Sequence, residues 1–344
     1  MSKGDVTLKD IAQAVGKSVA AVSRALHDYP DISIETRAHI KKVAQEMGYR
    51  PNILAQRLQK QRTDTLGFIL PTPSPRLMDP YFSELLAGLA AEAAAHGFDL
   101  LVATSPPGAE EERAYERLVE GRRVDGLVLA RVRRDDPRIV YLANQEFPFV
   151  AIGRAEYQGD DFPHIWLDVR PGFQAVIEHL QQQGFAKIGF IAPPPELTFA
   201  VEGLAAFRGA MRRLNLAVHD DWLTSSDFSQ RGGYQAAHQL LSKAKAPQAV
   251  VTCHDLVGLG VVAAAQDQGL EIGRDLAVTG FGNIPLAEYM QPPLTSLHQP
   301  TYAMGQRACR MLARLIKGEP LEKTRVVIEP SLVIRQSSGL ELWL

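Results

Sequence analysis

Apolar residues recur at three- and four-residue spacing in three short stretches near the N-terminus, a pattern typical of amphipathic helices. The first helix is expected over 8–15, because Thr7 and Asp10 have the form of a capping box and Gly16 can end it. The next two are expected over 18–26 and 33–47, each opened by a serine that can cap it. Three such helices predict a small all-α domain.

A segment rich in Gln and Arg follows at residues 53–61. An isolated helix shorter than about 12 residues is marginal in water. We therefore interpret this segment as a linker that is helical only under some conditions.

From residue 65 onward, short apolar runs alternate with amphipathic stretches of helical length. Strands are predicted at 65–70, 98–104, 124–130, 149–153, 165–168, 188–192, 249–253, 276–281 and 325–334. This alternation predicts parallel sheets covered by helices on both faces. About ten such units over roughly 270 residues exceed one typical domain, so we expect two similar α/β subdomains; a single TIM barrel remains an alternative.

These patterns predict a helical head, a linker and an α/β core, with crossovers between subdomains near 159–163 and 291–293. The expected boundaries are 1–50 for the head, 51–63 for the linker, 64–344 for the core, about 64–162 and 295–322 for the N-subdomain, and about 163–294 and 323–344 for the C-subdomain.

Composition narrows the class of protein further. The 344 residues are 46% hydrophobic and 22% charged, which is ordinary for a globular chain and argues against disorder or a coiled coil. The two cysteines, Cys253 and Cys309, cannot form a disulfide framework. There is no apolar signal region at the N-terminus and no apolar run of membrane-spanning length, so we expect a cytoplasmic protein that does not contact a membrane.

The net charge of −2 conceals an uneven distribution. Residues 1–62 hold eleven basic and six acidic residues, a net charge of +5, whereas the remainder holds 26 and 33, a net charge of −7. A basic head on an acidic body indicates that the head meets a polyanion. Chance clustering is the alternative that charge alone leaves open.

The two helices separated by Gly16 have the spacing of a helix-turn-helix unit, in which the second helix enters the major groove of DNA. Ser18 and Ser23 offer hydroxyls to phosphates, and Arg24 can form two hydrogen bonds with a guanine. Val19 and Ala20 are small enough to contact thymine methyl groups. The alternative is an ordinary three-helix bundle.

Catalytic and cofactor motifs are weak. The Gly16-Lys17-Ser18 sequence ends like a phosphate-binding loop, but Ile11 stands where that loop needs its first glycine. A loose dinucleotide pattern at 258–263 begins inside a helical stretch, which favours helix packing. The histidines lack metal-ligand spacing, so we expect no enzyme, no cofactor and no metal.

A small-molecule site is expected at the carboxyl ends of the strands, where open α/β sheets bind ligands. The candidates are Asp79, Phe82, Arg154, Phe228, His254, Asp255, Phe281 and Asn283. Aromatic faces beside hydrogen-bonding groups suit a polyol or sugar. The alternative is that Phe228 and Phe281 are core residues and that Asp255 only caps a helix.

The chain resembles the lac repressor (LacI-type) family of transcriptional regulators. The motifs that carry the resemblance are TLKDIA at 7–12, VSRAL at 22–26, GYRPN at 48–52, DLVGLG at 255–260, GF at 280–281 and PPLT at 292–295. The resemblance covers essentially the whole chain. It implies a helix-turn-helix head, a hinge helix, and a core similar to periplasmic sugar-binding proteins.

The resemblance also implies a homodimer, usually a repressor, that binds a near-palindromic double-stranded operator and responds to a small effector, most often a carbohydrate. Val19, Ala20 and Arg24 match base-reading positions, and Ala55 and Leu58 match hinge residues that enter the minor groove, where Leu58 would wedge between base pairs. The full set expected at DNA is Thr7, Ser18, Val19, Ala20, Ser23, Arg24, Asn52, Ala55 and Leu58.

Four positions depart from the family pattern. Ala21 replaces a frequent Thr, Gly203 a frequent Arg, Gly282 a frequent Asp, and His254 a usual Asn. Two polar sugar anchors are therefore missing, and Arg154, His254 or Asn283 are the expected replacements.

Two rival functions are a solute-binding protein for transport and a sugar-processing enzyme. The basic head counts against the first, and the lack of a recognisable acid–base pair counts against the second.

Overall fold

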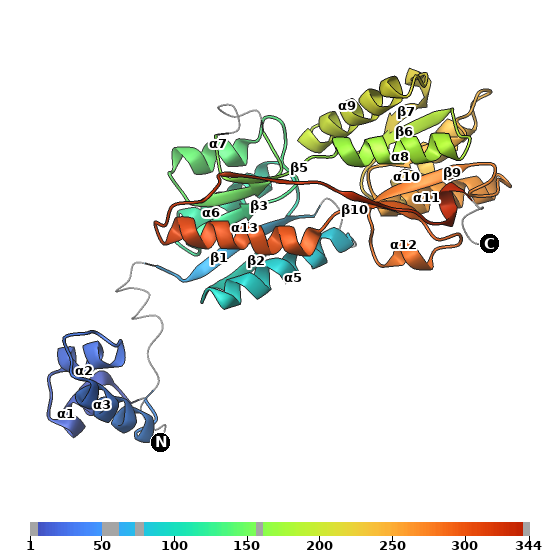
Figure 1. The fold of residues 1–344 in the computed structure, drawn as a ribbon. Coiled ribbons are helices and arrows are strands. Elements are labelled where there is room, and N and C mark those ends of the chain that lie inside the picture. The colour runs from blue at the N-terminus through green and yellow to red at the C-terminus, as the bar shows by residue number, and fades with distance from the viewer. Residues whose placement is uncertain (1–5, 50–61, 73–78, 156–160, 340–344) are drawn as a thin grey trace. The chain divides into compact units, whose positions relative to one another are not determined.

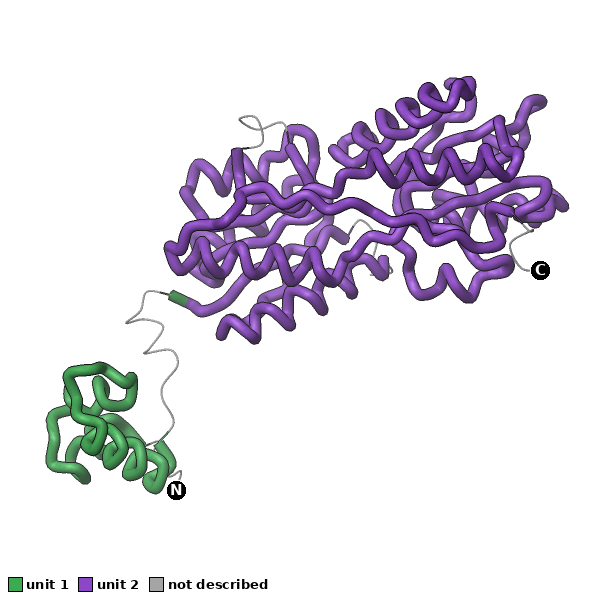
Figure 2. The backbone as a smooth tube through the Cα atoms, viewed as in Figure 1, with its two compact units in different colours: residues 1–62 green, residues 63–344 purple. Residues whose placement is uncertain are grey.

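The structure is a computed structural model, which describes residues 6–49, 62–72, 79–155 and 161–339. The chain divides into two compact units, residues 1–62 and residues 63–344 (Figure 2), and we describe each by itself. The expected linker at 51–63 lies almost entirely outside the described residues, as do Asn52, Ala55 and Leu58.

The first unit contains the three helices that the sequence predicts: α1 (Leu8–Val15), α2 (Val19–Leu26) and α3 (Ile34–Glu46). The Thr7 N–H donates to Asp10 Oδ2 at 2.8 Å, as a capping box requires, and Gly16 ends α1 in the left-handed conformation with φ of 63°. Apolar side chains from all three helices form one small core. Its buried members are Ile11, Ala12, Val22, Ala25, Ile40 and Ala44.

The second unit contains two six-stranded sheets, each the centre of a subdomain (Figure 1). The N-terminal subdomain contains β1 (Thr65–Pro71), β2 (Asp99–Ser105), β3 (Gly126–Leu129), β4 (Phe149–Ile152), β5 (His164–Leu167) and β11 (Arg325–Ile328). Its strands are all parallel, in the order β2-β1-β3-β4-β5-β11. Helices α5 (Pro80–Ala95) and α13 (Thr301–Ile316) cover one face, and α6 (Ala109–Val119) and α7 (Pro137–Asn144) cover the other.

The C-terminal subdomain repeats this arrangement. It contains β6 (Ile188–Ala192), β7 (Leu223–Ser225), β8 (Ala249–Thr252), β9 (Ala277–Gly282), β10 (Thr295–His298) and β12 (Ser331–Val333). The order is β7-β6-β8-β9-β10-β12, parallel except for the antiparallel edge strand β12. Helices α8 (Arg170–Gln182) and α9 (Thr198–Arg213) cover one face, and α10 (Gln230–Leu241), α11 (Asp255–Asp267) and α12 (Leu286–Tyr289) cover the other. Two 3-10 turns lie at Asp220–Trp222 and Gln336–Ser338.

The predicted fold class is confirmed, and the TIM barrel is excluded, because the strands form two open sheets. The expected subdomain boundaries near 163, 295 and 323 each need correction by one strand. β5 and β11 pair in the N-terminal sheet, and β10 pairs in the C-terminal sheet. The predicted crossovers near 159–163 and 291–293 are wrong, because they lead into β5 and β10, which still belong to the preceding sheet. The chain crosses after β5, after β10 and after β11 instead.

The predicted strand over 325–334 is also corrected. Glu329 and Pro330 divide it into β11 and β12, which lie in different sheets. Proline has no N–H for a strand ladder, so the pairing stops there and the chain passes to the other subdomain. The sequence reading also missed β7, β10, α7 and α12, which are short.

No helix among the described residues is long and apolar enough to span a bilayer. Numbered within its own sheet, each subdomain has the strand order 2-1-3-4-5-6. The order reverses beside the first strand, and such a reversal creates a ligand-binding crevice at the carboxyl ends. In the second unit, residues that follow the carboxyl ends of strands in both subdomains line one shared cavity.

Candidate functional site

A cavity of about 110 Å³ lies between the two subdomains. The residues that line it follow strand ends of both sheets or lie on the helices next to them. They include Glu84, Arg131, Arg154, Trp166, Thr198, Glu202, Phe228, His254, Phe281 and Gly282. We call this space the cleft cavity. Aromatic rings and a few charged groups share its wall, the combination typical of small-molecule sites.

Arg131 is the central polar group of the cleft cavity, and the sequence reading did not single it out. It comes two residues after β3, and its backbone has φ of 53°, a left-handed value that non-glycine residues rarely adopt. Its guanidinium forms an ion pair with Asp79 and lies 3.2 Å from the centroid of the Phe228 ring. The buried NH1 atom has no hydrogen-bond partner among the described residues, so it is available to a ligand.

Asp79 and His254 connect the subdomains across the cleft. The Leu256 N–H donates to His254 Nδ1, and His254 Nε2 donates to Asp79 Oδ1 at 3.1 Å. Burial by itself would raise the pKa of Asp79. The hydrogen bond from His254, the charge of His254 and the charge of Arg131 together outweigh burial and lower that pKa to about 2. Asp79 is therefore an anion at neutral pH.

A second polar group in the cleft cavity is built on Trp166. Its indole N–H donates to Glu202 Oε1 at 3.0 Å, and Glu202 forms an ion pair with Arg154 at 3.5 Å. The guanidinium of Arg154 stacks 4.9 Å from the Trp166 ring. The sequence reading predicted Arg154 here but not Trp166 or Glu202. Trp166 lies inside the strand predicted over 165–168, so the rule of strand ends does not point to it.

Four of the predicted effector residues line the cleft cavity: Arg154, Phe228, His254 and Phe281. Asp79 does not line the cavity itself, but it forms ion pairs with Arg131 and His254, which do. Phe281 also packs in the core, as the alternative reading held, whereas Phe228 is only partly buried.

The structure places the other three predicted effector residues outside this wall. Phe82 is buried in the core of the N-terminal subdomain, because it faces the sheet from α5. Asp255 is fully buried, and its carboxylate accepts from Ile284 N–H and Ser296 Oγ, so it braces the loop after β9. Asn283 is held in that loop by a bond from its N–H to Ser296 Oγ. The alternative that Asp255 only caps a helix is also wrong, because the N-cap of α11 is His254.

The structure explains why glycine stands at the two positions, 203 and 282, where the family often has a polar sugar anchor. A Cβ at Gly203 would lie 3.6 Å from Phe190 and 3.7 Å from Phe173, so this position faces core rings, and its neighbour Glu202 reaches the cleft instead. Gly282 has φ of 118°, where an L side chain is strained. A Cβ there would also lie 3.6 Å from Asp255 Oδ2, so an aspartate would face another carboxylate.

On the first unit, most of the described residues predicted to bind DNA lie on α2 or at its N-cap, and Thr7 is the N-cap of α1. Ser18 Oγ accepts from Ala21 N–H at 3.1 Å and so caps the helix. Val19 is 40% exposed, and Ala20 and Arg24 are exposed beyond it. Arg24 NH1 lies 2.6 Å from Asp31 Oδ2, an ion pair that the sequence reading did not predict. Ser23 is half-buried, and the Thr7 hydroxyl donates to Asp10.

No group of three or more His, Cys, Asp or Glu side chains able to hold a metal ion occurs in the part of the chain that the structure describes. The charged groups of the cleft cavity form ion pairs or face its space. They suit binding by hydrogen bonds and stacking.

Comparisons with known proteins match both units. Residues 7–52 match the family described as bacterial regulatory proteins, lacI family, and residues 177–338 match a periplasmic binding protein-like domain. The transcriptional regulator CelR of Thermobifida fusca is 31% identical over 96% of this chain and 98% of that protein. The transcriptional repressor CytR of Escherichia coli K12 is 30% identical over 96% of each chain.

Solved structures match over the same length. A complex of CelR with cellobiose has a TM-score of 0.76 at 30% identity, and covers 96% of this chain and 99% of that one. A lac repressor dimer bound to operator and the anti-inducer ONPF has a TM-score of 0.84 at 25% identity, and covers 97% and 99%. The named relatives are transcriptional regulators, not enzymes.

Proposed function

The chain belongs to the lacI family of bacterial regulatory proteins, and from this premise we propose that it is a homodimeric repressor whose binding to a near-palindromic operator is controlled by a carbohydrate effector. The observation that carries the proposal is a basic helix-turn-helix unit with an exposed recognition surface on a chain that also holds a cavity between two sheets. Such a protein works in the cytoplasm, where its DNA partner is.

In this proposal, α2 enters the major groove. Val19 and Ala20 contact base edges, Arg24 binds a guanine, and Ser18 and Ser23 approach phosphates. Thr7 stands at the start of α1, where the first N–H groups of the helix favour a phosphate. Ala55 and Leu58 are assigned to the minor groove, and Asn52 to DNA, by the family resemblance alone.

The cleft cavity is the proposed effector site. Arg131 NH1 and Thr198 Oγ1 are buried atoms without hydrogen-bond partners among the described residues, and both belong to residues that line the cavity. Glu84 and Glu202 offer carboxylate oxygens to hydroxyl groups, and aromatic rings surround them. Donors, acceptors and rings of this kind suit an uncharged polyhydroxylated ligand. The cellobiose in the structure of CelR supports the same ligand class.

Control of DNA binding is proposed to act through closure of the two subdomains. Asp79 belongs to the N-terminal subdomain and His254 to the C-terminal one, so their hydrogen bond exists only in a closed arrangement. A ligand shifts such an equilibrium by its difference in affinity for the two arrangements. An effector that displaces or completes the contacts of Arg131 would therefore change the population of the closed form.

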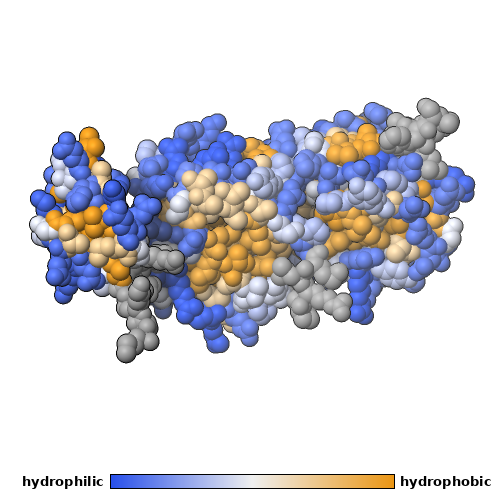
Figure 3. Space-filling model, turned by 90° about the horizontal axis from the view of Figure 1, so that it is seen from below, coloured by the Kyte–Doolittle hydropathy of each residue, from blue (hydrophilic) through white to orange (hydrophobic). Residues whose placement is uncertain are grey.

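The proposed dimer has a candidate surface on the N-terminal subdomain. The solvent side of α5 is made of small residues: Ser83, Ala87, Ala90, Ala91, Ala94 and Ala95. Figure 3 shows a continuous apolar area on this side of the second unit. Nearby Val102 of the edge strand β2 is 44% exposed. Exposed apolar areas of this kind mark protein interfaces, and a second copy would cover them.

A thermal-shift screen of neutral mono- and disaccharides, with cellobiose included, tests the effector proposal. A sugar that binds the folded protein raises its unfolding temperature by mass action. We expect at least one sugar to do so, and to change the affinity of the full chain for an operator. If no sugar in the screen raises the unfolding temperature, the carbohydrate assignment is wrong.

A further inference from the structure

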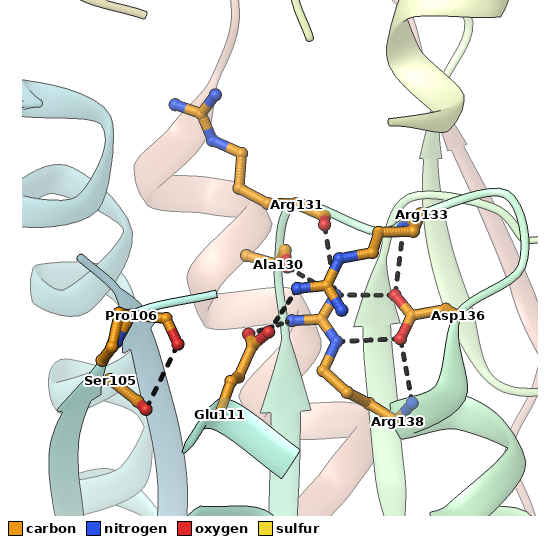
Figure 4. Close-up of polar contacts among 8 residues, drawn as sticks. All are labelled: Ser105, Pro106, Glu111, Ala130, Arg131, Arg133, Asp136 and Arg138. Atoms are coloured by element: carbon orange, nitrogen blue, oxygen red, sulfur yellow. Dashed lines mark hydrogen bonds and ion pairs between the residues drawn. The ribbon is translucent and has the colours of Figure 1, made fainter. Parts of the chain in front are cut away.

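A buried cluster of charged side chains lies directly beneath the loop that carries Arg131. We call Glu111, Arg133, Asp136 and Arg138 the Arg138 cluster (Figure 4). The side chains of Glu111 and Asp136 are 0% exposed, and that of Arg138 is 1% exposed. Two guanidinium groups and two carboxylates balance in charge. Removing ionised groups from water is costly. We therefore ask which part of the structure these buried charges hold in place.

Arg138 is the centre of this cluster. Its guanidinium donates to both oxygens of Asp136, at 2.8 and 2.6 Å, and to Glu111 Oε1 at 2.9 Å. Its NH2 also donates to the carbonyl oxygens of Ala130 and Arg131, at 3.2 and 3.1 Å. Arg138 therefore ties the two carboxylates to the backbone at the end of β3.

Glu111 and Asp136 also bind Arg133, at the end of the loop away from β3. Glu111 accepts from the Arg133 guanidinium, and Asp136 Oδ2 accepts from the Arg133 N–H at 3.0 Å. The cluster thus holds residues 130–133 at both ends. Figure 4 shows the consequence for Arg131, whose carbonyl group faces the cluster while its guanidinium points away from it. Surroundings of this kind can hold Arg131 in its left-handed backbone conformation.

The loop also forms a backbone contact between the two subdomains. Thr198 N–H donates to Val132 O at 3.1 Å, and Arg134 N–H donates to Glu196 O at 3.2 Å. Arg133 and Leu197 form an antiparallel bridge between these two bonds. Thr198 is the first residue of α9, so its N–H has no acceptor within the helix. The protection of this amide from exchange therefore depends on the loop.

We propose that the Arg138 cluster is a positioning element of the effector site, which fixes residues 130–134 so that Arg131 faces the cleft cavity and the loop backbone docks on residues 196–198. Glu111 and Arg138 act through the loop and do not touch the cavity. The part of Arg131 in binding an effector rests on the proposed function. The docking of the loop on residues 196–198 does not rest on the proposed function, and it can be tested without a ligand.

The test is amide hydrogen exchange of the full chain in the Glu111→Gln variant. Glutamine keeps one carbonyl oxygen as an acceptor for Arg138 but places an amide NH2, which can only donate, against the Arg133 guanidinium. We expect exchange at the Thr198 and Arg134 amides to accelerate at least tenfold, while the amides of β6 keep their wild-type rates. Exchange at both amides within twofold of wild type would overturn the proposal.

Glu92→Gln is the matched control. Glu92 is another buried glutamate of the same subdomain, with an ion pair to Arg310, and it does not line the cleft cavity. This variant should leave the Thr198 and Arg134 amides unchanged. Equal acceleration in both variants would mean a general loss of stability and would also overturn the proposal.

If Glu111→Gln does not fold, Arg133→Met serves instead. The Arg133 side chain is 19% exposed, so its loss is easier to tolerate, and Arg138 keeps all its bonds. We expect a smaller acceleration at the same two amides, and wild-type exchange there would contradict the proposal. A sugar screen without a hit would leave these exchange results standing, so the two proposals fail separately.

Discussion

His254 Nε2 lies 3.1 Å from Asp79 Oδ1, and this hydrogen bond joins two residues 175 positions apart in two different subdomains. Both side chains are largely buried, with exposed fractions of 7% for His254 and 15% for Asp79. Because Asp79 also pairs with Arg131, one carboxylate connects the cleft residues of both subdomains. The bond is therefore a direct measure of closure.

His254→Phe should lower the free energy of unfolding by about 1–3 kcal/mol, because it removes a hydrogen bond to a charged group. Phenylalanine can keep the edge-on contact of the His254 ring with Phe228, whose ring centroids lie 5.5 Å apart with an interplanar angle of 80°. Urea unfolding of the full chain measures the change. His238→Phe, at an exposed position of α10, is the control and should cost less than about 0.5 kcal/mol. Equal losses in the two variants would refute the role given to His254.

Asp79 should make the protein acid-sensitive in a defined window. Its pKa is lowered from 3.8 to about 2 in the folded state, so its contribution is complete above pH 4 and is lost as the pH falls toward 2. The contribution is about 2 kcal/mol. The difference in unfolding free energy between wild type and Asp79→Asn should narrow by this amount between pH 5 and pH 2. A constant difference over that range would contradict the pKa shift.

Asp31→Asn should strengthen DNA binding. Asp31 holds Arg24 at 2.6 Å in the free protein, and both side chains are half-exposed. Removing this carboxylate releases the Arg24 guanidinium and takes one negative charge from the head. Because exposed ion pairs are weak, we expect a gain of at most about 1 kcal/mol. Fluorescence anisotropy with labelled DNA measures it, and weaker binding by the variant would mean that Asp31 supports the recognition surface instead.

Gly282→Asp should destabilise the protein without creating a sugar anchor. At φ of 118°, a side chain costs about 1–3 kcal/mol, and the new carboxylate would face Asp255. Differential scanning calorimetry should show a lower unfolding temperature. Gly209→Asp is a control, because nothing lies within 4 Å of a Cβ at that position. Tighter sugar binding by Gly282→Asp would show that the family anchor can be restored.

The sequence predicted the parts of this protein that depend on local pattern. The capping box at Thr7 and Asp10, the cap at Ser18 and the strand–helix alternation all express short-range preferences. The subdomain boundaries failed because strand pairing is a long-range property, which a loop composition does not reveal. β11 illustrates this, since it pairs with β5 about 160 residues earlier.

The candidate site was predicted in part for the same reason. The rule of strand ends pointed to Arg154 and His254, and both line the cleft cavity, because the carboxyl ends of parallel strands lie at one edge. Arg131 could have been found by that rule, as it directly follows a predicted strand. Asp79 and Phe228 were among the predicted effector residues, but their contacts with Arg131 could not be predicted. They reach it from other elements and, for Phe228, from the other subdomain.

The most direct test of the central claim is selection of DNA from a random double-stranded library by the purified full chain. The account predicts enrichment of one near-palindromic sequence, because two heads of a dimer read two equivalent half-sites. Arg24→Ala should lose about 1–3 kcal/mol of affinity for that sequence and relax the preference at one base pair of each half-site. No enrichment by the wild type, or the same sequence enriched equally well by Arg24→Ala, would contradict the account.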